Sequence, residues 1–285
     1  MSCAETCPIV SEKILLAMDG SSYSEGAIRE AIGFAKRCSS SLYIVSTLET
    51  NPEYETIGSN VFEKEEAEVM AYLESIKAMA ANEGLKCETI LRKSTDSSQA
   101  IVEEAIEKKV DIIVIGRRGR KGIVKLLMGE VSAKVIGHAP CNVLVVPRAA
   151  VISYRNILVA TDGSGHSIAA AEQAIRIAKR CGSSVTALSS IRSNDELGAA
   201  KSNINKVVEM AQKENVPAEG ITPMGRSYNV IVETAGGRGV DLIVMGISAK
   251  TALQKIFTGS AAEQVIGNAG CAVLIVKGGE SPATV

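Results

Sequence analysis

The sequence is built from two copies of one pattern, and this duplication constrains the fold more than any other feature. The run Ile14-Leu-Leu-Ala-Met-Asp19-Gly20-Ser21 returns in the second half of the chain as Ile157-Leu-Val-Ala-Thr-Asp162-Gly163-Ser164. A later run, Asp111-Ile-Ile-Val-Ile-Gly116, returns at a smaller offset as Asp241-Leu-Ile-Val-Met-Gly246, so the second copy is the shorter one. We expect the loss between Ser46 and Asp111, in the Glu49–Asn60 loop. A repeat period this far above about 50 residues indicates a duplicated domain rather than a solenoid.

The length agrees with two domains. The chain has 285 residues, and a domain commonly has roughly 100–200. We place the first domain at residues 10–148 and the second at 154–277. Hydrophobic residues make up 46% and charged residues 22% of the chain, which is typical of a folded globular protein. The net charge of -1 argues against a nucleic-acid coat and against charge-driven membrane binding.

The pattern at the N-terminus and the cysteine usage favour a cytoplasmic protein. No apolar run reaches the roughly 18 residues that a membrane span requires, and the N-terminus lacks the basic and apolar blocks of a secretory signal. There are seven cysteines, none of them in a Cys-x-x-Cys pair. We interpret them as reduced thiols.

Four of these cysteines occupy equivalent positions in the two copies, Cys38 with Cys181 and Cys141 with Cys271. We interpret them as small packing residues. Cys3 and Cys7 lie in the N-terminal tail, where an unpaired thiol is open to oxidation. Their spacing alone does not indicate a metal site.

Short β-branched runs alternate with helical patterns within each copy. In the first copy the expected strands are Ile14–Met18, Leu42–Thr47, Cys87–Leu91, Asp111–Ile115 and Asn142–Val146. The expected helices are Ser24–Cys38, Glu63–Asn82, Ser97–Lys109 and Val131–His138. Runs that are apolar throughout suit strands buried on both faces of a parallel sheet. The alternation predicts an α/β fold of two tandem doubly wound domains.

Ligands of such sheets bind beyond the carboxyl ends of the strands. Asp19 and its twin Asp162 fall at the end of the first strand of each copy, where a carboxylate can accept hydrogen bonds from a ribose or an amine. The alternative is that Asp or Ser merely caps the following helix.

The loop after the fourth strand is the second candidate position. Gly116 and Gly119 let backbone N–H groups approach an anion, and Gly129 opens a helix whose N-terminus attracts phosphate. The loop is not a Walker loop, and the first turns do not carry a Gly-x-Gly-x-x-Gly dinucleotide pattern. Arg117, Arg118, Arg120 and Lys121 either neutralise phosphates or form a solvated basic loop.

A strand ending in Asp-Gly-Ser, combined with Gly-x2-Gly-x9-Gly after a Val/Ile-rich fourth strand, resembles the universal stress protein family. The resemblance covers both copies. It implies a five-stranded parallel sheet in the order 3-2-1-4-5, flanked by helices, in each copy. It also implies ATP or AMP as ligand, with Mg as an optional companion, bound through Gly-x2-Gly-x9-Gly-(Ser/Thr).

The motif is incomplete in both copies. The first copy has Glu130 where the family motif has Ser or Thr, and the second has Ala249 in place of the second glycine. Asp19 and Asp162 match the adenosine-side aspartate of the family, and Thr47 and Ser190 match the position whose backbone faces adenine. The resemblance thus implies a binding set of Asp19, Thr47, Gly116, Gly119, Gly129, Glu130 and Val131 in the first copy, and Asp162, Ser190, Gly246, Gly259, Ser260 and Ala261 in the second.

The function that this set predicts is adenine-nucleotide binding by a regulatory, cytoplasmic stress-type protein. One alternative is a weak ATPase that uses the same loop, although no general base or magnesium-binding carboxylate pair accompanies the glycines. Another is a tandem partner-binding protein with degenerate pockets. His138 and His166 stand alone in the sequence, so neither a catalytic triad nor a metal site is predicted.

The partners that we expect are an adenine nucleotide and the other copy of the domain, without nucleic acid or membrane. Asn142–Val146 and Ala272–Val276 are short apolar runs, each at the end of its copy. Exposed edges of this kind need a cover, so we expect these strands to pair and join the two domains as a pseudo-dimer. A homodimer of the whole chain is a further option.

Overall fold

Strands and helices alternate along the whole chain in the computed structural model, which describes residues 6–50, 59–118, 128–247 and 260–278. In the first copy the strands are β1 (Lys13–Met18), β2 (Ser41–Glu49), β3 (Cys87–Ser94), β4 (Ile112–Gly116) and β5 (Asn142–Val146). The helices between them are α1 (Glu25–Cys38), α2 (Ser59–Asn82), α3 (Ser97–Lys108) and α4 (Glu130–His138), with a short 3-10 turn, η2 (Ser22–Ser24), before α1.

The second copy repeats this order. Its strands are β6 (Asn156–Ala160), β7 (Ser184–Leu188), β8 (Ala218–Ile221), β9 (Leu242–Ile247) and β10 (Ala272–Lys277). Its helices are α5 (Gly165–Cys181), α6 (Leu197–Lys213), α7 (Ser227–Gly237) and α9 (Ala261–Asn268), with the 3-10 turn η3 (Asn194–Glu196) before α6.

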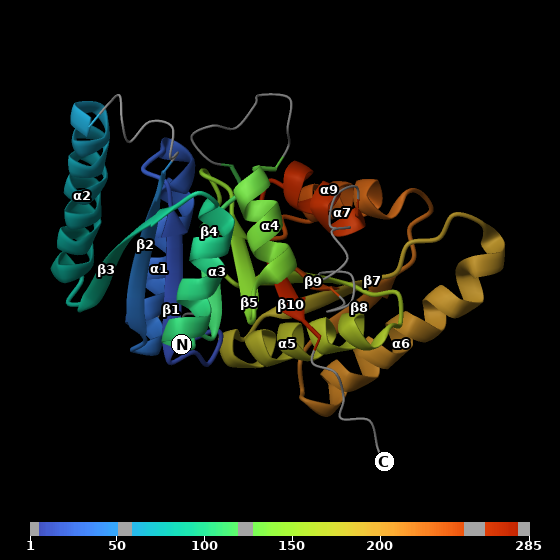
Figure 1. The fold of residues 1–285 in the computed structure, drawn as a ribbon. Helices are drawn as coiled ribbons and strands as arrows, with labels where there is room; N and C mark the ends of the chain where they lie inside the picture. The colour runs from blue at the N-terminus through green and yellow to red at the C-terminus, as the bar shows by residue number, and fades with distance from the viewer. Residues whose placement is uncertain (1–5, 51–58, 119–127, 248–259, 279–285) are drawn as a thin grey trace, which may run out of the picture.

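All ten strands belong to one sheet, which runs through the middle of the molecule (Figure 1) in the order β3-β2-β1-β4-β5-β10-β9-β6-β7-β8. Each half has the order 3-2-1-4-5 with parallel neighbours. The predicted fold of two doubly wound domains is therefore confirmed. The halves meet where β5 and β10 pair antiparallel, with Leu144 opposite Leu274. Because of this reversal, the carboxyl ends of the strands point in opposite directions in the two copies.

The shortening of the second copy is not confined to the loop where we expected it. Helix α2 has 24 residues whereas its counterpart α6 has 17. The strands on either side of it are shorter too, since β2 has 9 residues and β7 has 5. An outer helix can lose turns at its end without disturbing the central strands, because the buried middle of the sheet does not depend on its full length.

Two apolar layers, one on each face of the sheet, continue through both copies. One layer joins Ile28 of α1 to Ile175 of α5 through Leu144 and Leu274 of the central strands. The other contains residues of α3 and α7 on the opposite face. Each layer excludes water across the junction between the domains, so hydrophobic burial holds the copies together.

The segment that connects the two copies is fixed to α1. Arg29 donates a 2.7 Å hydrogen bond to the carbonyl oxygen of Ala150, and Arg148 forms an ion pair with Glu25 at 2.9 Å. Gly26 lies where the connection crosses the helix, and a Cβ there would come within 2.3 Å of the Pro147 carbonyl oxygen. A side chain at this position is excluded by the close approach of the backbone.

The interpretation of the cysteines as reduced thiols is wrong for Cys7, Cys38 and Cys181. Cys7 and Cys38 form a disulfide, with their Cα atoms 4.6 Å apart, and Cys181 is also disulfide-bonded. The bond forms because the N-terminal segment folds back against the end of α1, where Ile9 is buried. Cys87, Cys141 and Cys271 are free thiols, and Cys3 lies outside the described residues.

Among the helices that the structure describes, none combines the length and the apolar character needed to cross a bilayer.

Candidate functional site

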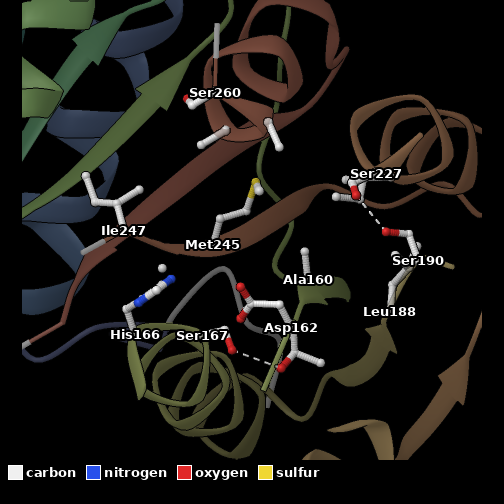
Figure 2. Close-up of a pocket in the computed structure, with 15 residues that line it drawn as sticks. Ala160, Asp162, His166, Ser167, Leu188, Ser190, Ser227, Met245, Ile247 and Ser260 are labelled. Carbon is white, nitrogen blue, oxygen red and sulfur yellow. Dashed lines mark hydrogen bonds between the residues drawn. The ribbon is translucent and has the colours of Figure 1, made fainter. Parts of the chain in front are cut away.

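A cavity of about 260 Å³ lies at the carboxyl ends of the strands in the second copy. This is the edge of the sheet where ligands of doubly wound folds bind. Its walls come from the ends of β6, β7 and β9 and from the first residues of α5, α7 and α9 (Figure 2). The cavity brings together five of the second-copy residues singled out in the sequence: Asp162, Ser190, Gly246, Ser260 and Ala261. The sixth, Gly259, and Ala249 lie outside the described residues.

Asp162 follows β6 after one intervening residue, Thr161, and its carboxylate is held by the turn that starts α5. Asp162 Oδ1 accepts a hydrogen bond of 3.0 Å from the backbone N–H of Ser164 and a second from the Ser164 hydroxyl. Partial burial alone would raise the pKa of Asp162, but these hydrogen bonds hold it below its ordinary value. The carboxylate is therefore charged at neutral pH. The helix cap itself is Ser164, whose side chain accepts from the backbone N–H of Ser167, so Asp162 does not cap α5.

His166 lines the same cavity. It was not among the site residues predicted from the sequence. Its Nε2 lies 3.0 Å from Ser164 Oγ, so Asp162, Ser164 and His166 form one polar chain at the mouth of the site. The signal was weak because a lone histidine shows no partner in the sequence. Its partner is a serine two residues earlier, and the contact exists only once the turn has formed.

Ser227 is a second residue that sequence reasoning missed. Its hydroxyl and that of Ser190 are 2.7 Å apart, on the side of the cavity formed by β7 and α7 (Figure 2). Ser227 begins α7 as Ser97 begins α3, at the same offset that relates Gly116 to Gly246. That equivalence is the sequence signal that could have placed it at a strand end.

Gly246 and Ser260 shape the far wall. A Cβ on Gly246 would lie 2.0 Å from the carbonyl oxygen of His166, so this position admits no side chain. Ser260 caps α9, its Oγ accepting a 3.1 Å hydrogen bond from the backbone N–H of Glu263. The N-terminus of α9 thereby faces the cavity beside Ala261. A helix N-terminus carries partial positive charge and attracts anions.

The first copy arranges its matching residues differently. Asp19 Oδ1 accepts hydrogen bonds from the backbone N–H and hydroxyl of Ser21 and from the hydroxyl of Ser24, at 3.1, 2.7 and 2.9 Å. The α1 helix here follows a 3-10 turn rather than a capped start. Thr47 is half-buried near the end of β2, and Gly116 is buried at the end of β4. Gly119 lies outside the described residues.

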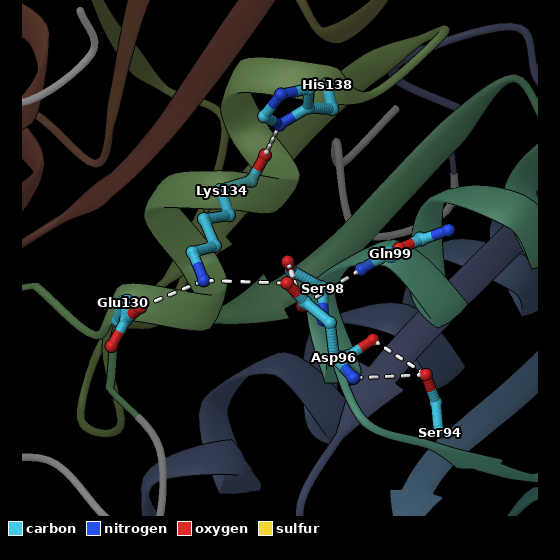
Figure 3. Close-up of polar contacts among 7 residues, drawn as sticks. All are labelled: Ser94, Asp96, Ser98, Gln99, Glu130, Lys134 and His138. Carbon is cyan, nitrogen blue, oxygen red and sulfur yellow. Dashed lines mark hydrogen bonds and ion pairs between the residues drawn. The ribbon is translucent and has the colours of Figure 1, made fainter. Parts of the chain in front are cut away.

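Glu130 is the first residue of α4 and its carboxylate faces along the helix. It forms an ion pair of 2.9 Å with Lys134, whose ammonium is also 3.5 Å from Asp96 (Figure 3). The side chain of Glu130 is 76% exposed. Gly129 before it is the helix cap, and Val131 after it is half-buried. Glu130 thus has a cationic partner on its own helix.

One arginine of the basic loop serves the domain junction. Arg117 Nη1 donates a 2.7 Å hydrogen bond to the carbonyl oxygen of Ala269, at the end of α9 in the other copy. Burial, and then the charge of Arg118, lower its pKa. This finding departs from both sequence-based options for Arg117, phosphate neutralisation and a solvated loop. Arg120 and Lys121 lie outside the described residues.

No group of three or more His, Cys, Asp or Glu side chains placed to hold a metal ion occurs in the described part of the chain. Figure 2 shows what the cavity offers instead: Asp162 and His166 on one side, Ser260 across from them, and the Ser190–Ser227 pair at one end. The arrangement suits a ligand that carries hydroxyl or amine donors at one end and negative charge at the other.

The fold defines a doubly wound α/β protein with a cavity at the carboxyl ends of its strands, and similarity to known proteins specifies the family. The family model of the universal stress protein family matches residues 11–147 and 153–277. The chain belongs to the universal stress protein family.

Several known proteins are similar to this chain in sequence or in fold. A putative universal stress protein of Staphylococcus aureus (strain USA300) is 35% identical over 141 residues, which are 48% of this chain and 85% of the relative. A universal stress protein from Archaeoglobus fulgidus has the same fold, with a TM-score of 0.79 at 20% identity over 95% of this chain and all of that one. A putative universal stress protein from Pseudomonas aeruginosa follows with a TM-score of 0.69 at 18% identity, over 94% of this chain and 93% of its own.

Proposed function

We propose that this protein binds one adenine nucleotide, ATP or AMP, in the cavity of the second copy, and that its role is regulatory rather than catalytic. The observation that carries the proposal is the convergence of Asp162, Ser190, Gly246 and Ser260 on one cavity at the carboxyl ends of the strands. Membership of the universal stress protein family supports it.

The polar groups of the cavity suggest how the nucleotide is oriented. The Asp162 carboxylate, with Oδ1 occupied by Ser164, accepts a hydrogen bond from a ribose hydroxyl or from the adenine amine. A phosphate is repelled by this carboxylate and attracted by the N-terminus of α9 at Ser260. The nucleoside therefore lies toward β6, and the phosphates lie toward α9. Mg would accompany ATP at that end.

The first copy has residues equivalent to those of the second-copy site, but one of them is unfavourable for a phosphate. The set that the family resemblance implies for this copy is Asp19, Thr47, Gly116, Gly119, Gly129, Glu130 and Val131. Glu130 stands where a serine stands in the second copy, and a carboxylate repels an outer phosphate. We therefore assign the nucleotide to the second copy.

The domain arrangement is part of the proposal. We place the domains at residues 10–148 and 154–277 and describe them as a pseudo-dimer joined at β5 and β10, whose pairing is antiparallel. A homodimer of the whole chain would use other surfaces, because both of these strands are already paired on both sides.

Calorimetric titration of the full chain with AMP and ATP tests the proposal. Asp162→Asn keeps the size of the side chain and removes its charge. A lost charge-assisted hydrogen bond is worth roughly 1.5–3 kcal/mol, so both ligands should weaken by about ten- to a hundred-fold. The matched control is Asp19→Asn, the same change at the equivalent position of the first copy, which should leave the main affinity unchanged.

An equal loss of nucleotide affinity in both variants would show that both copies bind nucleotide. Unchanged affinity in Asp162→Asn would show that the nucleotide does not bind in this cavity. A single-turnover assay with labelled ATP separates the regulatory role from the weak ATPase. Retention of intact ATP over many hours is the result that we expect.

A further inference from the structure

A second cavity, of about 450 Å³, lies where the two copies meet, away from the nucleotide cavity. We call it the junction groove. Helix α5 of the second copy passes below β5 and β10 (Figure 1) and forms one wall. The groove is lined by Pro8, Ile9, Val10, Val110, Asp111, Pro140, Cys141, Asn142, Gln173, Arg176, Arg180 and Lys277. None of these residues lines the nucleotide cavity.

The charged groups in the groove are mostly cationic. Arg176 and Arg180 come from α5 and Lys277 from the end of β10. The one carboxylate in the lining, that of Asp111, accepts hydrogen bonds of 2.8 and 3.0 Å from the backbone N–H groups of Glu12 and Lys13. Asp111 is therefore engaged by the entry to β1. Arg176 lies 3.8 Å from the carboxylate of Glu172 on its own helix, so the excess of positive charge in the groove comes chiefly from Arg180 and Lys277.

Lys277 is held in place at the edge of the groove. Its ammonium donates to the carbonyl oxygens of Ile136 and Gly137, at 2.5 and 3.2 Å, at the end of α4. Two of its three N–H donors are thus used, and one remains. Burial lowers the pKa of Lys277 to about 8, so the group is still predominantly protonated at neutral pH.

The internal duplication shows what occupies the equivalent place on the other side of the junction. There Arg37 forms a 2.7 Å ion pair with Glu30. The ring of Tyr154 lies beneath the Arg37 guanidinium, at 5.5 Å, and its hydroxyl donates a 2.6 Å hydrogen bond to Glu30. An aromatic ring and a carboxylate therefore fill this counterpart, and the carboxylate pairs with its arginine through Nη2.

In the junction groove both of those groups are replaced. Arg180 corresponds to Arg37, but Gln173 corresponds to Glu30 and Ser11 to Tyr154, at the same offset that relates Asp19 to Asp162. The hydroxyls of Ser40 and Ser183 donate to the carbonyl oxygens of Ser11 and Tyr154 respectively, which confirms that these two positions are structurally equivalent.

The replacements leave an arginine without its carboxylate. Arg180 is exposed, and within the described residues it has no hydrogen-bond or ion-pair partner. Gln173 is a neutral amide whose Oε1 accepts from Arg176, at 2.8 Å. Ser11 has no aromatic ring to place beside Arg180, whereas the ring of Tyr154 lies beside Arg37 in the counterpart.

We propose that the junction groove binds a small multivalent anion, a phosphorylated or polycarboxylate metabolite, whose negative charge meets Arg180 as the Glu30 carboxylate meets Arg37. Arg176 and the remaining Lys277 N–H complete the set of donors. The volume lies in the range of small-molecule sites, roughly 300–1,000 Å³, and such sites favour domain junctions. An anion bound there would bridge α5 and β10 of the second copy to the starts of β4 and β5 in the first copy, where Asp111 and Asn142 line the groove.

Calorimetric titration of the full chain at constant ionic strength tests this proposal, with pyrophosphate as the phosphate probe and citrate as the carboxylate probe. Arg180→Gln should weaken binding about tenfold, the loss expected for one charge-assisted contact. Lys179→Gln is the matched control, because it removes the same charge from the neighbouring residue of α5. Lys179 pairs with Glu214 outside the groove, and its variant should bind like the wild type.

A third variant, Gln173→Glu, restores the internal carboxylate of the counterpart. It should compete with the external anion and weaken its binding by a similar factor. If pyrophosphate binds and citrate does not, the groove is a phosphate site. If citrate binds and pyrophosphate does not, it is a carboxylate site. Equal affinities in Arg180→Gln and Lys179→Gln, or no saturable binding of either probe, would overturn the proposal. This test is independent of nucleotide binding, since Arg180 lies outside that cavity.

Discussion

The hydroxyl of Tyr154, in the connection between the copies, donates a 2.6 Å hydrogen bond to Oε1 of Glu30 in α1. Both side chains are buried. Burial raises the pKa of Glu30, against the opposing effects of Arg37 and of the tyrosine hydroxyl. This hydrogen bond joins the connecting segment to the first copy. It also gives the buried Glu30 carboxylate a partner in place of water.

Removing that hydroxyl should destabilise the whole chain. Tyr154→Phe keeps the ring over Arg37 and leaves Glu30 with one hydrogen bond fewer in a buried place. We expect a loss of about 2 kcal/mol in the free energy of unfolding, the usual scale for a hydrogen bond to a charged group. Urea denaturation measures it, and a loss under about 0.5 kcal/mol, typical of surface substitutions, would show that this contact contributes little.

The cap of α3 should make stability depend on pH. Asp96 accepts hydrogen bonds from the hydroxyl and backbone N–H of Ser98 and from the backbone N–H of Gln99 (Figure 3). The Ser98 hydroxyl is the largest cause of the lowered pKa of Asp96, which these bonds and Lys134 hold down against partial burial. The carboxylate therefore adds stability that is fully present above its ordinary pKa and is lost as the pH falls through the lowered one.

Two substitutions separate the cap from the charge. Asp96→Ala should cost about 1 kcal/mol at neutral pH, whereas Asp96→Asn retains a good cap and should cost less. The difference between wild type and Asp96→Asn should vanish in acid, below the lowered pKa. A difference that stays constant from neutral pH to acid would show that the ionised carboxylate is not the stabilising form.

The disulfide should contribute measurably to stability. Cys7 and Cys38 are 31 residues apart, and closing a loop of this size is worth about 2–4 kcal/mol. The double variant Cys7→Ser/Cys38→Ser, compared with Cys87→Ser at a free thiol, should lose that amount in urea denaturation without reductant. Equal stability of the two variants would show that the N-terminal segment is not bonded to α1 in solution.

The tight contact beneath Gly246 should make this position intolerant of any side chain. A Cβ there meets the carbonyl oxygen of His166 at 2.0 Å, whereas a Cβ on Gly236 in α7 meets nothing within 4 Å. Gly246→Ala should destabilise the protein by about 1–3 kcal/mol, as overpacking does, and weaken nucleotide binding. Gly236→Ala should stabilise it by roughly 0.5–1 kcal/mol. Chemical denaturation measures the free energy of unfolding of both variants. A Gly246→Ala variant as stable as the wild type would contradict the close contact between Gly246 and His166.

Local patterns sufficed for the strands and helices, because each depends on residues close together in the sequence, whereas the strand order 3-2-1-4-5 was implied by the family resemblance. The apolar run Ile112–Ile115 could be recognised as a strand buried on both faces, and β4 covers it. The Asp162 turn was predictable as a strand end in the same way.

Contacts between distant parts of the chain were not predictable from the sequence. The Cys7–Cys38 bond depends on the path of the N-terminal segment, and the Arg117 contact with Ala269 depends on how two domains meet. His166 shows its partner only after the turn at Ser164 has formed. In each case the sequence shows the two groups, but their contact depends on how distant segments of the chain fold against each other.

We propose that the second-copy cavity, and not its first-copy counterpart, binds adenine nucleotide. Native mass spectrometry of the full chain with AMP or ATP tests it most directly, because it counts the ligands on each chain. We expect one nucleotide per chain, retained in Asp19→Asn and lost in Asp162→Asn. No bound nucleotide, or one nucleotide that Asp19→Asn removes and Asp162→Asn retains, would contradict it.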